Sequence, residues 1–113
     1  MKVGNISNGV IVQNFLKAII DIVVESTSSK HSFLVVDRLN SKLGDKFKFS
    51  KSIRIHNNSI EVGKEIDTVN KWQLRSFFIQ VINLAGAAYL KNILAKRLSR
   101  KQLSYLEYIG LNL

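Results

Sequence analysis

The sequence predicts an α+β fold that is mostly helical, with one two-stranded antiparallel hairpin packed on helices. Apolar residues recur at helical spacing in four segments, and one segment in the middle of the chain alternates apolar and polar residues. Proline is absent from all 113 residues, as expected for a chain of regular elements. The predicted order is helix, helix, hairpin, long helix, short helix, within a single domain over residues 1–113.

The first helix is expected from about Val10 to Glu25, with Asn8 as its N-cap. A strand is the alternative for this segment, because its content of β-branched residues is high. The apolar residues that recur at helical spacing are Ile11, Phe15, Ile19, Ile22 and Val23.

A second helix is expected from about Lys30 to Leu43, after a stretch of serine and threonine over residues 26–29. Gly44 is expected to end this helix, because glycine readily adopts the left-handed conformation that closes helices. The side chains predicted to be buried are Phe33, Val36 or Leu34, Leu39 and Leu43.

The middle of the chain predicts a β-hairpin with Asn57 and Asn58 as a two-residue turn, because asparagine tolerates positive φ. In this register, apolar and oppositely charged residues pair on separate faces, and a shift by one residue removes both sets of pairs. The apolar pairs are Ile55 with Ile60, Ile53 with Val62 and Phe49 with Ile66, and the charged pairs are Arg54 with Glu61 and Lys48 with Asp67.

Lys51 and Lys64 fall opposite each other on the apolar face of this hairpin. Like charges in such positions are unfavourable unless they reach solvent or hold an anion. The two lysines are therefore a candidate anion-binding pair.

A long helix is expected from Val69 to Arg97, with Thr68 as its N-cap. At about 1.5 Å per residue it spans roughly 43 Å, whereas a globule of this size has a diameter of about 34 Å. The helix must therefore kink, protrude or meet a second subunit. Its apolar stripe is expected to contain Trp72, Phe78 or Phe77, Ile82 or Val81, Ala85, Tyr89, Ile93 and Leu94.

Small residues in the middle of this helix would let another helix approach closely. The sequence therefore predicts a homodimer or higher oligomer, with a break at Gly86 as the structural alternative. The interface is predicted at Ala85, Gly86, Ala88 and Tyr89.

The last helix is predicted from a capping box, in which Ser99 and Gln102 stand three residues apart. Leu103, Leu106 and Ile109 are expected to face the core, and Gly110 is expected to end the helix.

The chain carries 17 Lys plus Arg against 8 Asp plus Glu, a formal charge of +9. This excess favours phosphate backbones, anionic membrane surfaces or acidic proteins as partners, and it does not select among them. A background composition rich in Lys and Asn is the alternative explanation of the charge.

Basic residues gather where the last two helices meet, and a second basic run over residues 42–54 contains Asp45 as its only acid. The first group is the predicted phosphate-binding site. Cations near a helix C-terminus also complement its dipole, which is the competing interpretation, and a helix-turn-helix is a weaker third one. The residues of the first group are Lys91, Lys96, Arg97, Arg100 and Lys101.

Catalysis is poorly supported, and no cofactor or metal site is predicted. The chain has no cysteine, and His31 and His56 are expected to be polar surface residues rather than general bases. Asp21 and Glu25 share a helical face without a third ligand for a cation. Neither of the two glycine-rich phosphate-binding motifs occurs.

Among the aromatic residues, Phe47, Phe49 and Trp72 are expected in the core. Tyr105 and Tyr108 can lie near the basic residues of the last helix, where they could stack bases or pack at an interface. The start of the chain lacks the apolar run of a signal peptide, and no segment predicts a membrane span, so a cytoplasmic location is expected.

The leading functional prediction is a small non-enzymatic protein that binds, or associates with, nucleic acid and contacts phosphates through its basic patch. The alternative is a protein-interaction module that dimerises through the long helix, with a charge that is incidental or faces an acidic partner.

Overall fold

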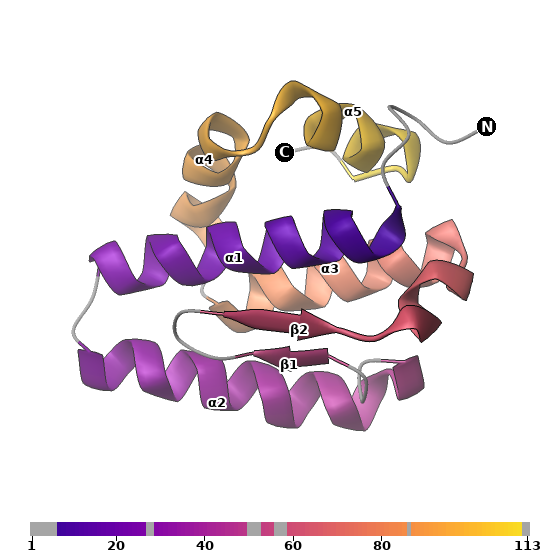
Figure 1. Ribbon diagram of the computed structural model, residues 1–113. Coiled ribbons are helices and arrows are strands. Elements are labelled where there is room, and N and C mark those ends of the chain that lie inside the picture. The colour runs from indigo at the N-terminus through magenta and orange to yellow at the C-terminus, as the bar shows by residue number, and fades with distance from the viewer. Residues whose placement is uncertain (1–6, 27–28, 50–52, 56–58, 86, 112–113) are drawn as a thin grey trace.

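The computed structural model describes residues 7–26, 29–49, 53–55, 59–85 and 87–111 of the chain. Within them, five α-helices and one two-stranded antiparallel sheet, with short 3-10 segments, surround a shared apolar core (Figure 1). The predicted α+β class is therefore confirmed. The molecule measures 42 × 29 × 21 Å, with a radius of gyration of 13.1 Å.

Helix α1 (Asn8–Ser26) lies at the centre of the molecule (Figure 1). It contacts α2 (Ser29–Lys46), α3 (Lys71–Ala85), α4 (Ala87–Arg97), strand β2 (Ile60–Val62) and the 3-10 helix η3 (Lys64–Thr68). Because neighbours cover it on most sides, it can be apolar over most of its circumference. The segment is a helix and not the alternative strand. Its buried apolar side chains are Ile11, Val12, Phe15, Leu16, Ile19, Ile20, Ile22 and Val23.

Asn8 is the first residue of α1 and not its N-cap. Ser7 takes the capping position, and its Oγ accepts a hydrogen bond from the backbone N–H three residues later at 3.3 Å. The Asn8 amide instead donates to the carbonyls of Ile66, at 3.0 Å, and Val69, at 3.1 Å, and accepts from the Tyr105 hydroxyl. Asn8 therefore joins the start of α1 to two later parts of the chain.

Because of the Tyr105 hydroxyl, we expect the free energy of unfolding to depend on pH in the alkaline range. Burial raises the pKa of Tyr105 above its usual value of 10.0, and the charges of Tyr108 and Asp67 raise it further. The folded state therefore holds this proton more tightly than the unfolded state does. The stability that this Tyr105 proton contributes is complete below pH ~10 and is lost as the pH rises through the pKa of Tyr105 in the folded state.

We expect the free energy of unfolding to fall more steeply with pH in the wild type than in Tyr105→Phe as the pH rises above ~10. Urea unfolding at a series of pH values across this range measures the difference. The other groups that titrate at alkaline pH are the same in both proteins, so the comparison with Tyr105→Phe cancels their contributions. Parallel curves for the two proteins would contradict the assignment.

Helix α2 (Ser29–Lys46) continues past Gly44, so the predicted stop is wrong. An added Cβ at Gly44 would meet open space, and a glycine inside a helix costs only about 1 kcal/mol relative to alanine. The predicted burial of Phe33 is also wrong, because Phe33 is 62% exposed, and its neighbour Leu34 is exposed as well. The buried stripe that fixes the helix phase is Ser32, Val35, Val36, Leu39 and Leu43.

The hairpin register is confirmed. Strands β1 (Ile53–Ile55) and β2 (Ile60–Val62) are antiparallel. The predicted turn at Asn57 and Asn58 lies outside the described residues. The pairs are Ile53 with Val62, Arg54 with Glu61 and Ile55 with Ile60.

A hairpin of this length is marginal alone, and amide side chains from two helices support its edges. Asn40 of α2 donates to the carbonyl of Ile55 at 2.9 Å and accepts from its N–H at 3.1 Å. Gln13 of α1 donates to the carbonyl of Ile60 at 2.9 Å. The hairpin is therefore held between α1 and α2 (Figure 1).

The predicted pairs farther from the turn do not form, because the chain leaves the sheet after Val62. Residues Lys64–Thr68 form the 3-10 helix η3, which buries Ile66 against α1 and lets Asp67 accept a hydrogen bond from the N–H of Gly9 at 3.0 Å. Ile66 and Asp67 therefore do not pair with Phe49 and Lys48 across strands, and the Lys51–Lys64 anion pair loses its basis. Lys64 is exposed on η3, and Lys51 lies outside the described residues.

The predicted long helix is two helices, α3 (Lys71–Ala85) and α4 (Ala87–Arg97). Figure 1 shows α4 leaving the direction of α3 and rising beside α1. Asn70 caps α3 in place of Thr68, since Asn70 and Gln73 exchange hydrogen bonds at 2.9 and 3.4 Å. The alternative with a break near Gly86 is therefore the one observed, although Gly86 itself lies outside the described residues.

Because α3 and α4 are separate helices, neither of them is too long for the globule, and helix length no longer supports a second subunit. The homodimer therefore stays a prediction without that support. Of the predicted interface residues, Ala85 is buried in the core of its own chain. Gly86 and the side chains of Ala88 and Tyr89 lie outside the described part of the structure.

Candidate functional site

Four basic residues flank the connection between the end of α4 and the start of α5 (Arg100–Tyr108). Lys96 and Arg97 stand in the last turn of α4, and Arg100 and Lys101 open α5. The connection contains only Leu98 and Ser99, and Leu98 is buried in the core. We call these four residues, Lys96, Arg97, Arg100 and Lys101, the basic junction. The side chain of Lys91, predicted with them, lies outside the described part of the structure.

The capping box predicted from the sequence is confirmed and fixes the start of α5. Ser99 Oγ accepts from the backbone N–H of Gln102 at 3.3 Å, and Gln102 Oε1 accepts from the backbone N–H of Ser99 at 3.0 Å. Together with the buried Leu98, these contacts hold the two helix ends close in space. The basic junction is therefore built on fixed backbone.

One member of the basic junction has a partner within the molecule. Arg97 forms an ion pair with Glu25 at the end of α1, and both side chains remain substantially exposed. Lys96, Arg100 and Lys101 are exposed as well. An exposed ion pair is worth about 0–1 kcal/mol, so a phosphate can replace Glu25 beside Arg97 at small cost.

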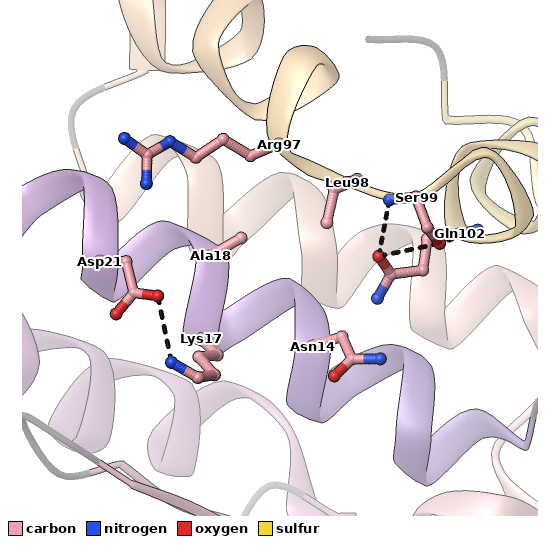
Figure 2. A pocket seen from close by; sticks show the side chains of 8 residues that line it. All are labelled: Asn14, Lys17, Ala18, Asp21, Arg97, Leu98, Ser99 and Gln102. Atoms are coloured by element: carbon pink, nitrogen blue, oxygen red, sulfur yellow. Dashed lines mark hydrogen bonds and ion pairs between the residues drawn. The ribbon is translucent and has the colours of Figure 1, made fainter.

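A cleft of about 630 Å³ lies below the basic junction, between α1 and the α4–α5 connection (Figure 2). Lys17 and Asp21 form an ion pair at 3.1 Å on its α1 side. Gln102 Oε1 is fixed by Ser99, so its amide nitrogen points toward Asn14, where it is buried without a hydrogen-bond partner among the residues that the structure describes (Figure 2). The full lining is Asn14, Lys17, Ala18, Asp21, Arg97, Leu98, Ser99 and Gln102.

The structure separates the two carboxylates considered as a cation pair. Asp21 pairs with Lys17, whereas Glu25 pairs with Arg97. Within the described residues, no group of three or more potential metal ligands comes together. None of the helices described combines the length and apolarity that a membrane span requires.

The two tyrosines of α5 have different environments. Tyr105 is buried and bonded to Asn8, whereas Tyr108 is 53% exposed at the opposite end of α5 from the basic junction. Lys71 Nζ lies 5.3 Å from the centroid of the Tyr108 ring and 5.3 Å from that of Trp72. Trp72 is 64% exposed, so its predicted place in the core is wrong.

Sequence reasoning missed this aromatic surface because Trp72 stands in the first turn of α3, directly ahead of the buried stripe of that helix. The buried stripe of α3 begins two residues later, at Leu74, and that offset turns Trp72 away from the core. The buried stripe consists of Leu74, Phe77, Phe78, Val81, Ile82 and Ala85.

The second basic run is distant from the basic junction. It belongs to α2 and the residues that follow it, whereas α4 and α5 lie on the other side of α1 (Figure 1). Lys46 from this run contacts Gln80 at 3.4 Å and lies 5.9 Å from the centroid of the Phe47 ring. The basic residues therefore form separate groups, and the basic junction has to act as a local site.

Comparisons of the chain with protein-family models, with curated proteins and with solved structures found no match.

Proposed function

We propose that this protein is a small non-enzymatic nucleic-acid-binding protein that contacts phosphates through the basic junction. The supporting observation is the two-residue connection between α4 and α5, which concentrates Lys96, Arg97, Arg100 and Lys101 on fixed backbone. Because the backbone of this cluster is already fixed, only the side chains lose conformational freedom when it binds. The charge of +9 favours its encounter with a polyanion.

The chemistry of the basic junction suits phosphate groups. Arg97 and Arg100 each offer a planar guanidinium that can donate two parallel hydrogen bonds to a phosphate. Lys96 and Lys101 add flexible point charges beside them. Contacts of this kind position a nucleic acid without reading its sequence, and they release counterions, so binding weakens steeply with salt.

Neutralising the basic junction should reduce nucleic-acid affinity more than an equal loss of charge elsewhere. The triple variant Arg97→Gln, Arg100→Gln, Lys101→Gln should lower affinity similarly for unrelated sequences, and each lost phosphate contact should reduce the salt slope by roughly 0.9 on duplex DNA. Fluorescence anisotropy of labelled DNA and RNA, titrated at several salt concentrations, measures both quantities.

The matched control replaces Lys30, Lys42 and Lys48 with glutamine, which removes three exposed charges from α2 and the residues after it. A larger loss in the junction variant supports the site. Equal losses would show that binding follows net charge alone, and the basic junction would then not be a site. Failure of the wild type to bind any nucleic acid at low salt would contradict the function itself.

A further inference from the structure

We infer that Trp72 and Tyr108 form a platform on which an unpaired base of a single-stranded nucleic acid stacks, while the basic junction holds phosphates of the same strand. This inference rests on the proposed function and specifies the class of nucleic acid. We call Lys71, Trp72 and Tyr108 the aromatic platform.

The aromatic platform exposes two large rings beside one ammonium. Trp72 stands in the first turn of α3 and Tyr108 is the last residue of α5, and both rings are more than half exposed. Lys71 Nζ lies 5.3 Å from the centroid of each ring, a distance typical of cation–π contacts. Side chains of this size usually bury most of their surface, so their exposure together indicates a binding surface.

Contacts on both sides of the aromatic platform hold it in place. The reciprocal hydrogen bonds of Asn70 and Gln73 fix the first turn of α3. Arg75, one turn further along α3, donates from Nε to the carbonyl of Gly110 just after α5, at 3.1 Å. Gly110 has a φ of 91°, which favours glycine and turns the chain back at this point. The two rings therefore sit on backbone elements that are tied together.

The exposed face of α5 connects the aromatic platform with the basic junction. Lys101 and Tyr108 are two helical turns apart, about 10 Å along the axis, and both are exposed. At about 3.4 Å per nucleotide along a stacked strand, roughly three nucleotides cover this distance. Glu107 is an acid on the same face. The exposed residues of α5 are Arg100, Lys101, Ser104, Glu107 and Tyr108.

The chemistry of the aromatic platform favours single strands over duplexes. In a duplex each base is stacked between its neighbours, so protein rings can reach only phosphates and groove edges. In a single strand the faces of the bases are free, and aromatic side chains stack on them with little regard to sequence. The charge of +9 also favours a polyanion over a second copy of this chain, because two such copies repel each other.

Trp72 is the only tryptophan of the chain, so its fluorescence reports on the aromatic platform alone. Titration with a short oligothymidylate at low salt should quench this fluorescence, whereas a duplex of equal length should bind with little quenching. Anisotropy of the same labelled oligonucleotides reports total binding. Trp72→Ala should lower single-strand affinity roughly fivefold or more and leave duplex affinity within about twofold, and Trp72→Phe should keep most of the affinity.

The matched control is Phe33→Ala, which removes a similarly exposed ring from α2, a helix that carries no residue of the aromatic platform. Equal effects of Trp72→Ala and Phe33→Ala, or equal quenching by duplex and single strand, would overturn the aromatic platform while leaving the basic junction in place. If Trp72 fluorescence is quenched as the protein concentration rises in the absence of oligonucleotide, the aromatic platform binds a second copy of this chain instead. Anisotropy that shows no binding of either form would overturn both proposals.

Discussion

Replacing Phe77 with alanine is expected to lower the free energy of unfolding by about 3–5 kcal/mol. The Phe77 ring is fully buried, and its centroid lies 5.5 Å from that of Phe49, 5.7 Å from that of Phe47 and 5.8 Å from that of Phe78. The substitution loses the transfer free energy of the ring and leaves a cavity between α3 and residues 47–49. Urea unfolding followed by far-UV circular dichroism measures the loss.

Trp72→Ala is the matched control for Phe77→Ala, because it removes a large aromatic ring from the same helix at an exposed position. We expect the control to change stability by no more than about 0.5 kcal/mol. Similar losses in the two variants would mean that Phe77 does not lie in a packed core.

The second large effect is expected from Asn8→Ala, which should cost about 2–4 kcal/mol. The substitution removes both amide donors and the acceptor, so the Val69 carbonyl and the Tyr105 hydroxyl lose their partner, and the Ile66 carbonyl keeps only the N–H of Val69. Stranding several partly buried polar groups costs more than deleting one hydrogen bond. Denaturant unfolding measures the loss, and Asn83→Ala, at an exposed position of α3, is the control.

A double-mutant cycle separates the contacts of Asn8. Tyr105→Phe alone removes only the hydroxyl contact, so Asn8→Ala should cost less in the Tyr105→Phe background than in the wild type. We expect a coupling free energy of about 0.5–1.5 kcal/mol. Additive losses would show that the two side chains do not interact.

The hairpin register was predictable because two independent patterns agree on it. Apolar pairing of Ile53 and Ile55 on one face and charge pairing of Arg54 on the other face are satisfied by the same alignment. The alternation continues to Ile66, but the strand does not, because burial of Ile66 against α1 is available only once the whole molecule is assembled.

Helix phase and long-range pairing were the features that local patterns left undetermined. Phe33 stands next to Leu34 and Trp72 stands two residues before Leu74, and which residue faces inward depends on the elements packed against the helix. The separation of α3 from α4 was indicated by comparing helix length with domain size and not by periodicity. The partners Arg97 and Glu25 lie far apart in the sequence, so the partial neutralisation of the basic junction required the tertiary structure.

The central position of α1 has a consequence for the order of folding. The first helix of the chain is covered by α4 and linked through Asn8 to Tyr105 of α5, so its apolar surface closes only when the last helices dock (Figure 1). During synthesis α1 leaves the ribosome before α4 and α5, which complete its surroundings. Contacts of such wide sequence separation carry a loop-closure cost that slows folding. Until those helices dock, the most apolar α-helix of the described structure keeps part of its apolar surface exposed to solvent.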